Sequence, residues 1–445
     1  MELSAFPGFL SMICDRFTVL ATFFMVLALV FDYMKRRKCQ NYPPGPRGFP
    51  FFGNSLQVDL NNPHLSFAKL WKEYGSVVSI QLGWTNTVIL NGYEALKQAL
   101  VKKSEDFADR PNLAIYEDFF KRAGEGIVFA KYGRWWKEQR KFSLLTLRNF
   151  GLRKKSLETR IVEEAGFLNK EFENAKGRPF DPHFYLSCAT SNIICSIVFG
   201  ERFGYQDKTY LEFLNVFDEI FELEGGFWGQ LLNTFPFIRH FPGPHNKIFE
   251  NQNKAVEFVQ EKVMEHKKQW DPNEPRDFID AFLTEQEKMK HEPQTSFLET
   301  NLLGTLFDLF AAGTETTSTT LRWGLLFMVL YPNVQSKVQG EIDSVIGKER
   351  KPILEDREEM PYTNAVIHET QRLGNIVPNS LPHQTYRDTE VMGYTIPKVA
   401  VCAWGSSWQR LNSSCSSPPC SNSSHSISQK MSQDQTTLNP NSESP

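Results

Sequence analysis

The 445-residue sequence has little cysteine, no excess of positive charge and only one long hydrophobic run. Its seven cysteines are scattered, without CxxC pairs or the density of a disulfide scaffold, which is typical of a reducing compartment. The formal net charge of −3 provides no global basic field, so nucleic acid is not expected as a partner. Hydrophobic residues at 41% and charged residues at 23% exclude collagen-like, wholly disordered and multi-span membrane proteins. The 37 phenylalanines favour a large apolar interior or cavity.

The one long apolar run covers residues 17–31, and a basic cluster at 35–38 follows it directly. As a helix the run would be about 22 Å long, somewhat short of the ~30 Å hydrocarbon core of a bilayer. A cleaved signal peptide is the alternative, but its basic residues precede the apolar run, and here they come after it. The positive-inside rule therefore predicts a retained signal-anchor over residues 1–38, with the body of the protein in the cytosol.

Three further segments differ in composition. Residues 39–52 hold the stretch YPPGPRGFP, which predicts either a stiff hinge of fixed direction or an ordinary interdomain linker. Residues 53–398 are expected to form a mainly helical body, with a β-hairpin from the β-branched runs at 77–83 and 87–90. Residues 399–445 end in serine-rich sequence without aromatic residues, which predicts a divergent, disordered tail.

Two pairs of residues at helical spacing are candidates for a site. Trp136 and Arg140 are four residues apart, which places an indole and a guanidinium on one helical face. Such a pair suits the carboxylate of a large planar ligand, and it equally fits the edge of an amphipathic helix. Glu369 and Arg372 have the i, i+3 spacing of a helical ion pair, a feature that is common on exposed faces and weak evidence alone.

A third candidate is the polar sequence LFAAGTETTSTT at 309–320, which interrupts an apolar stretch over 299–331. Its hydroxyl groups are able to bond to backbone carbonyls and open the helical turn. One long buried helix with a notch that admits water or oxygen is one interpretation. Two helices joined by a polar turn is the other, and composition leaves both open.

In order and spacing, these motifs resemble those of the cytochrome P-450 superfamily, the haem-thiolate monooxygenases. The shared patterns are the proline-rich hinge, WxxxR, AGxET and ExxR, and the likeness extends over residues 1–398. The stretches 136–151, 180–203 and 312–323 are most similar to the microsomal family two, and within it to the J-type subfamily of fatty-acid epoxygenases. The resemblance implies the mainly α cytochrome P-450 fold with small β-sheets and a membrane anchor in the endoplasmic reticulum. It also implies oxidation of fatty acids or lipophilic xenobiotics with NADPH and O2.

The resemblance further implies roles for individual residues. Trp136 and Arg140 would contact a haem propionate, and His383 would bind another. Ala312 would face the haem. The remaining motif residues would serve proton delivery and structure, with Glu315 and Thr316 in an oxygen-activating notch and Glu369 and Arg372 as a buried structural ion pair.

The expected partners are membrane lipid, a lipophilic small molecule, NADPH–cytochrome P-450 reductase and cytochrome b5. Lys137, Lys141 and Arg148 would offer positive charge to the reductase. These expectations come from the resemblance alone.

The sequence departs from the family where the haem iron is held. The family's axial ligand is the cysteine of an FxxGxRxCxG loop, and residues 399–445 contain no such pattern. Cys402 is expected at a strand end facing away from that loop. Cys415 and Cys420 lie in serine-rich sequence without a framework to hold a thiolate below the haem. No metal ligand is therefore expected in this chain, and its haem binding is put in question.

Two functions follow from this departure. The first is a membrane-anchored haem monooxygenase, which describes the family. The second is a non-catalytic, membrane-tethered relative that binds reductase or lipid, or is degraded. We expect the second for the 445-residue chain, because loss of haem removes a ligand that stabilises the fold.

Overall fold

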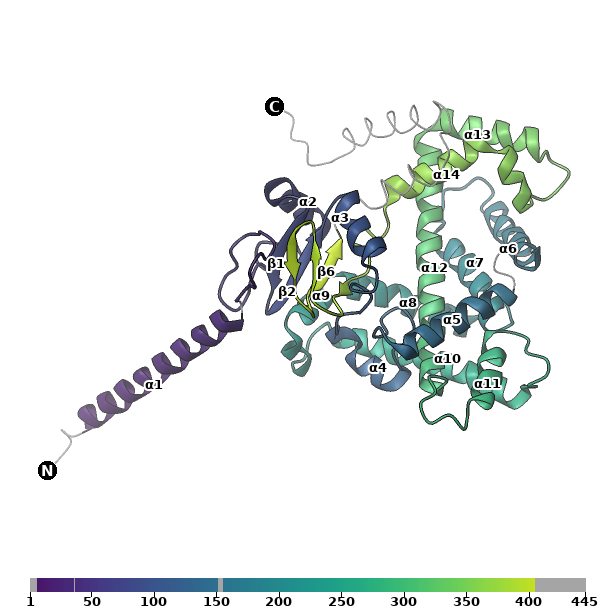
Figure 1. The fold of residues 1–445 in the computed structure, drawn as a ribbon. Helices are drawn as coiled ribbons and strands as arrows, with labels where there is room; N and C mark the ends of the chain where they lie inside the picture. Colours follow the sequence, from purple (N-terminus) through teal and green to yellow (C-terminus); the bar gives the residue numbers. More distant parts are fainter. Residues whose placement is uncertain (1–5, 36, 151–154, 405–445) are drawn as a thin grey trace.

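The computed structural model describes residues 6–35, 37–150 and 155–404, which form a helical part and a smaller β part (Figure 1). The helices are α1 (Phe6–Lys35), α2 (Pro63–Tyr74), α3 (Tyr93–Lys97), α4 (Glu117–Ala123), α5 (Arg134–Asn149), α6 (Lys155–Asn174), α7 (His183–Val198), α8 (Lys208–Gly225), α9 (Phe227–Thr234), α10 (Asn246–Gln269), α11 (Phe278–Lys288), α12 (Glu299–Leu330), α13 (Pro332–Val345) and α14 (Pro361–Gly374). Shorter helical turns are η1 (Gln98–Lys102), η2 (Ala114–Tyr116), η3 (Pro236–His240) and η4 (Leu354–Glu359). The strands are β1 (Val77–Leu82), β2 (Thr85–Leu90), β3 (His383–Gln384), β4 (Thr389–Val391), β5 (Tyr394–Ile396) and β6 (Val401–Trp404). The expected mainly helical fold with small sheets is confirmed.

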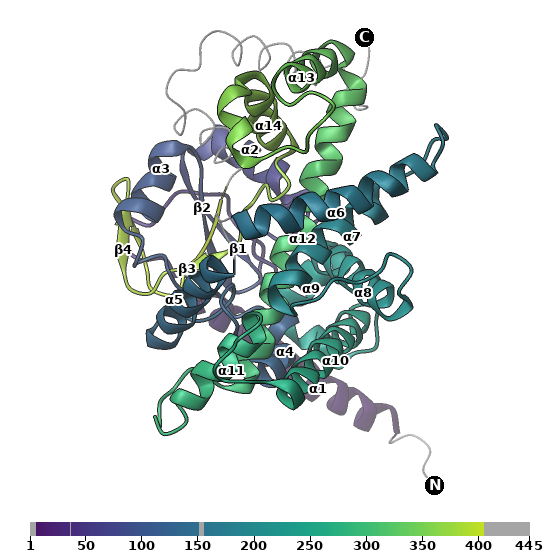
Figure 2. The same ribbon diagram turned by 90° about the vertical axis from the view of Figure 1, so that its right-hand side faces the viewer.

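Helix α12 is the centre of the helical part, with α7, α8 and α10 packed against it (Figures 1 and 2). The expected phenylalanine-rich interior lies between these helices. The rings of Phe213 and Phe258 stack with centroids 3.9 Å apart, and Phe213 lies 4.6 Å from Phe310 of α12. Phe217 lies 4.9 Å from Phe307, again centroid to centroid. Many phenylalanines therefore fill a close-packed core around one helix.

The polar sequence inside α12 does not break the helix. α12 continues through residues 309–320, so the single-helix interpretation is confirmed and the interpretation with a polar turn is wrong. The hydroxyls of Thr316 and Thr320 donate to the carbonyls four residues earlier, at 2.6 and 2.7 Å. The helix therefore satisfies these hydroxyls internally and stays regular.

The larger sheet has the strand order β1-β2-β6-β3. The predicted hairpin is confirmed, because β1 and β2 pair antiparallel with Val77 opposite Leu90. Strand β6 joins β2 in parallel and brings Cys402 opposite Val88. The first strands of the body and the last described strand therefore meet in one sheet. A separate pair, β4 and β5, is antiparallel.

The proline-rich segment follows the edge of β1. The backbone N–H of Ser79 donates to the carbonyl of Pro44 at 2.7 Å, and its hydroxyl donates to the carbonyl of Pro43 at 2.7 Å. A Cβ at Gly45 would lie 1.8 Å from the Ser79 carbonyl oxygen, so only glycine fits this approach. The segment is held on the sheet over these residues.

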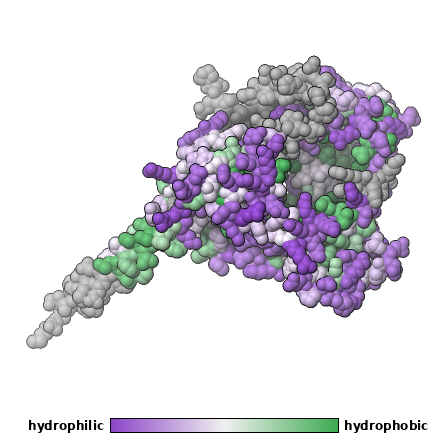
Figure 3. Space-filling model, in the orientation of Figure 1, coloured by the Kyte–Doolittle hydropathy of each residue, from purple (hydrophilic) through white to green (hydrophobic). Residues whose placement is uncertain are grey.

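Helix α1 projects from the β part of the molecule, and its surface over residues 18–35 is strongly apolar (Figures 1 and 3). Residues Thr18–Lys35 form the one described helix that is long and apolar enough to cross a membrane. The expected apolar helix is therefore present, and length and composition are the evidence that it is an anchor.

Candidate functional site

Helix α5 places the predicted Trp136 and Arg140 on one face. The Arg140 guanidinium lies 5.3 Å from the centroid of the Trp136 ring, within the range of a cation–π contact. The indole Nε1 donates to the carbonyl of Ile127 at 3.0 Å, which fixes the ring. Arg140 is exposed, and no acidic side chain among the described residues forms an ion pair with it. Its guanidinium has the chemistry to bind an anionic group.

A buried carboxyl group ties the segment before α5 to α12. Asp308 Oδ2 accepts hydrogen bonds from the backbone N–H groups of Ile127 at 2.7 Å and Val128 at 2.9 Å. Burial raises the pKa of Asp308 to about 7, although both N–H donors favour the charged form. Ile127 thus connects Trp136, through its carbonyl, to Asp308, through its N–H. Sequence analysis missed Asp308; the available signal was an acid inside the apolar stretch LLGTLFDLF.

The middle of α12 carries Ala312 and Thr316 on one stripe of the helix. Ala312 is exposed and Thr316 is half-buried, whereas the neighbouring Phe310 is fully buried. The Thr316 hydroxyl donates to the Ala312 carbonyl. Here the central helix exposes the small side chain of Ala312, while the Thr316 hydroxyl stays bonded within the helix. The expected opening of the helical turn is therefore not seen, because the hydroxyls of Thr316 and Thr320 bond to carbonyls of a continuous helix.

Glu315 lies on a different side of α12, because consecutive helical residues are about 100° apart. Its carboxylate belongs to a cluster with His183 of α7 and Asp218 of α8, whose ligating atoms lie within 4.8 Å of one another. The Thr319 hydroxyl donates to Glu315 Oε1 at 2.8 Å. Burial raises the pKa of Asp218, and the nearby Glu315 charge acts in the same direction. The structure thus engages Glu315 with α7 and α8, while Thr316 bonds within α12.

Arg110 and His383 form a second group of nitrogen-containing side chains, held by backbone carbonyls. Arg110 Nη1 donates to the carbonyl of Pro382 at 2.8 Å, and His383 Nδ1 lies 2.6 Å from the carbonyl of Phe107. Burial, with the nearby Arg110 charge, lowers the pKa of His383 to about 4, so the ring is neutral near pH 7 with its proton on Nδ1. Burial also lowers the pKa of Arg110 to about 10. A desolvated cation favours an anionic ligand. The sequence gives no signal for Arg110, because it lies in a loop without periodicity.

The predicted ExxR pair is formed in α14. Arg372 Nη2 and Nε lie 2.6 and 2.7 Å from the two carboxylate oxygens of Glu369, a bidentate arrangement. Both side chains are largely buried, and α14 packs on α12. The i, i+3 spacing therefore places the two side chains within bonding distance on one helix.

The thiols of the described residues are poor candidates for an iron ligand. Cys402 is fully buried in the sheet core, and burial raises its pKa above the ordinary thiol range. Burial raises the pKa of Cys188 to about 12, and burial also raises the pKa of Cys195 well above the ordinary thiol value. Cys39 is exposed, beside the carbonyl of Thr395. The predictions for Cys415 and Cys420 lie outside the described residues.

Haem can be tested against these side chains. Arg110, Arg140, Trp136 and His383 have the chemistry that carboxylates of a planar ligand require. Burial favours the protonated form of Cys188, Cys195 and Cys402, and the exposed Cys39 lies beside the carbonyl of Thr395. The described residues therefore fit the carboxylate side of a haem and do not fit its iron.

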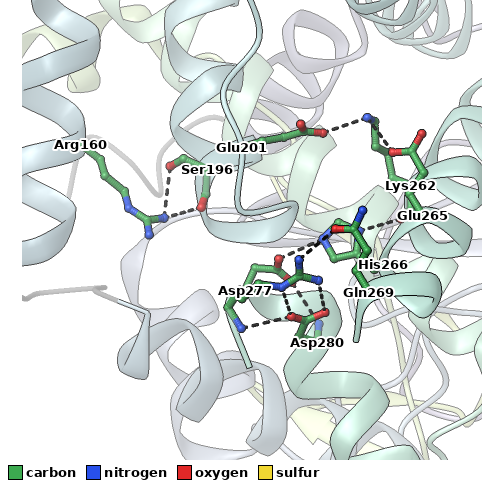
Figure 4. A network of polar contacts seen from close by, with 10 residues as sticks. Arg160, Ser196, Glu201, Lys262, Glu265, His266, Gln269, Asp277 and Asp280 are labelled. Atoms are coloured by element: carbon green, nitrogen blue, oxygen red, sulfur yellow. Dashed lines mark hydrogen bonds and ion pairs between the residues drawn. The ribbon is translucent and has the colours of Figure 1, made fainter. Parts of the chain in front are cut away.

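Another polar cluster has a structural role (Figure 4). His266 of α10 lies 2.9 Å from Asp277 Oδ2, and Asp277 Oδ1 accepts from the N–H of Asp280 at the start of α11. Asp280 pairs with Arg276 at 2.6 Å. With His266 Nδ1 on the Lys262 carbonyl, these side chains are engaged in joining α10 to α11.

Known proteins resemble this chain over most of its length. The family profile "Cytochrome P450" matches residues 43–408, which extends beyond residue 398. Human cytochrome P450 2J2 (Homo sapiens) is 49% identical over 384 residues, covering 86% of this chain and 76% of the human protein. Rat cytochrome P450 2J3 (Rattus norvegicus) is 47% identical over 379 residues, covering 85% and 74%. Dog cytochrome P450 2D15 (Canis lupus familiaris) is 46% identical over 388 residues, covering 86% and 78%. The chain belongs to the cytochrome P450 family of haem monooxygenases, within microsomal family two.

Proposed function

We propose that the chain is a relative of monooxygenases that oxidise fatty acids and other lipophilic small molecules. We further propose that, as a 445-residue protein, it does not catalyse this oxidation. The observation that carries the proposal is the contrast between the basic groups and the thiols. Arg140 and Arg110 suit haem carboxylates, while burial favours the protonated thiol at Cys188, Cys195 and Cys402. The FxxGxRxCxG pattern is also absent from the 445 residues.

The chemistry of the family depends on the cofactor. Haem supplies the iron at which O2 is activated, and a cysteine thiolate donates electron density to that iron. In this chain we assign Trp136, Arg140, Arg110 and His383 to the haem carboxylates, and Ala312 and Thr316 to the open face of α12. Glu369 and Arg372 have a structural role. Without a thiolate the remaining groups have no reaction centre to serve.

We further propose that α1 anchors the chain in the endoplasmic reticulum membrane with the body in the cytosol. The apolar surface of α1 and the basic residues that follow it support this orientation. A non-catalytic role would then be association with NADPH–cytochrome P-450 reductase, cytochrome b5 or lipid. Lys137, Lys141 and Arg148 support the first of these, because all three are exposed along α5.

The test is the reduced, carbon-monoxide difference spectrum of membranes that contain the full chain, with haem assayed in parallel. Human cytochrome P450 2J2 in the same membranes is the positive control. We expect a haem-thiolate band from the control and none from this chain at equal protein by immunoblot. A haem-thiolate band would overturn the proposal, and its loss in Cys402→Ser would identify the thiol. The same membranes, added to the control enzyme, test competition for reductase.

A further inference from the structure

The end of α1 that meets the body carries a buried acid. Asp32 is 4% exposed, although most side chains over residues 18–35 of the helix are exposed. A carboxylate withdrawn from water is costly unless donors compensate for the lost hydration. The donors that bind Asp32 therefore identify the parts of the body to which the end of α1 is attached.

Two donors from the body meet one oxygen of this carboxylate. Asp32 Oδ1 accepts from the backbone N–H of Phe51 at 3.1 Å and from the indole Nε1 of Trp84 at 3.2 Å. The ring of Phe31 lies edge-on to Trp84, with centroids 6.2 Å apart. The last turns of α1 are thus bound to the proline-rich segment and to the β1–β2 turn.

A second attachment lies just after the helix. Lys38 Nζ donates to Ser79 Oγ at 3.0 Å and lies 5.2 Å from the centroid of the Tyr42 ring. Burial lowers the pKa of Lys38, as expected for an ammonium group packed on the body. Lys35 and Lys38 are both exposed, and Lys38 differs in that its ammonium group bonds to Ser79 of the body.

We propose that these contacts form an anchor clasp, defined as Asp32, Phe51, Trp84, Lys38 and Ser79, which holds α1 at a fixed angle to the sheet. Two attachments separated along the chain oppose both bending and rotation at the junction, which a single covalent link would permit. Asp32 is the positioning residue, because it bonds two separate segments of the body. The consequence that the clasp orients the body on the bilayer rests on the anchor role proposed above.

The geometry separates two substitutions at the same position. The bonds from Phe51 and Trp84 both use Oδ1, so Asp32→Asn keeps a carbonyl oxygen for these two bonds and removes the negative charge. Asp32→Leu has similar volume and removes the acceptor, leaving the Phe51 N–H and the Trp84 indole without it. Trp84→Phe keeps an aromatic ring and removes one donor. Tyr33→Leu, at a neighbouring position that is 71% exposed, is the matched control.

The experiment measures the distance distribution between spin labels by pulsed electron paramagnetic resonance. Labels on noncanonical side chains replace Val19 of α1 and Leu65 of α2, both exposed, in the full chain in detergent and in phosphatidylcholine vesicles. We expect one narrow distribution for the wild type, Asp32→Asn and Tyr33→Leu. Asp32→Leu should lose the narrow peak, and Trp84→Phe should broaden it partly.

Equal distributions for the wild type and Asp32→Leu, or a broad distribution in the wild type, would overturn the clasp. Circular dichroism and the thermal midpoint show whether each variant is folded, and Trp84→Phe tests the same contacts if Asp32→Leu fails to fold. Carbonate extraction tests the anchor separately. A chain that is extracted from membranes yet keeps the narrow distribution in detergent retains the clasp and contradicts the anchor role.

Discussion

The two halves of α12 have similar apolar sequences and different surroundings. In the first half, five large apolar side chains are almost fully buried: Leu302, Leu303, Leu306, Phe307 and Phe310. In the second half, several are between 39% and 71% exposed: Leu321, Leu325, Leu326, Val329 and Leu330. Helices α4, α7 and α10 pack on α12, and its end contacts α13 and α14, where Phe327 and Val366 are buried together. A helix that is apolar on all sides needs cover on all sides, and within residues 6–35, 37–150 and 155–404 the first half of α12 is covered much more completely than the second.

The largest expected difference between the halves is in core packing. Phe310 is fully buried, with its ring centroid 4.6 Å from that of Phe213 and 4.8 Å from that of Phe217. Phe310→Ala removes these contacts and leaves a cavity, so we expect a loss of about 3–5 kcal/mol in the free energy of unfolding. Leu326→Ala, at a residue that is 45% exposed in the other half, should cost less than about 1 kcal/mol.

Urea unfolding of the full chain in detergent, followed by far-ultraviolet circular dichroism, measures both variants. Similar losses for Phe310→Ala and Leu326→Ala would mean that the two halves are equally packed, against the comparison. A midpoint shift confined to Phe310→Ala would support it.

Features that depend on local spacing could be predicted from the sequence, and features that depend on distant contacts could not. The hairpin of β1 and β2, the continuous α12 and the pairs on α5 and α14 depend on local spacing, which a sequence displays directly. Asp308 and Arg110 were missed because their significance comes from segments far along the chain: Asp308 meets Ile127, and Arg110 meets Pro382. The direction of Glu315 depends similarly on α7 and α8. Local periodicity therefore places motifs on elements, and tertiary contacts decide which groups meet.

A smaller effect on stability is expected from the contact of His266 with Asp277, which joins α10 to α11. Both ring nitrogens of His266 face acceptors: Nδ1 lies 2.7 Å from the Lys262 carbonyl and Nε2 lies 2.9 Å from Asp277. Burial acts to lower the pKa of His266, but the bond to Asp277, with the charges of Asp277 and Asp280, raises it on balance. The folded state therefore binds the second proton of this ring more readily than the unfolded state does.

A raised pKa in the folded state gives stability that is fully present below the unfolded value of 6.5 and is lost as pH rises through the folded pKa. We expect His266→Gln to cost about 1.5–3 kcal/mol at pH 6, for a lost charge-assisted hydrogen bond, and less at higher pH. Urea midpoints between pH 6 and pH 9 measure the difference. A cost that is independent of pH would contradict a charged His266.

His383 provides a control of opposite sign. Its pKa is lowered to about 4, so the folded state resists protonation and stability is lost as pH falls from 6.5 toward 4. The pH dependence of His383→Gln should therefore differ from that of the wild type only on the acid side. A change above pH 7 would indicate another group.

The smallest effect on stability, and the most specific to the second half of α12, is expected from polar substitution of its exposed apolar residues. Val329 is 71% exposed, so Val329→Ser should change the free energy of unfolding by no more than about 0.5 kcal/mol. Contiguous exposed apolar surface mediates association, so the double variant Leu326→Ser and Val329→Ser should bind less of a hydrophobic dye and self-associate less. Val101→Ser, at an isolated turn residue that is 61% exposed, is the matched control and should change neither. Equal reductions of dye binding and self-association in the control and the double variant would contradict this prediction. The effect would then follow from the hydrophobicity of single exposed residues, and not from apolar side chains gathered on one helix.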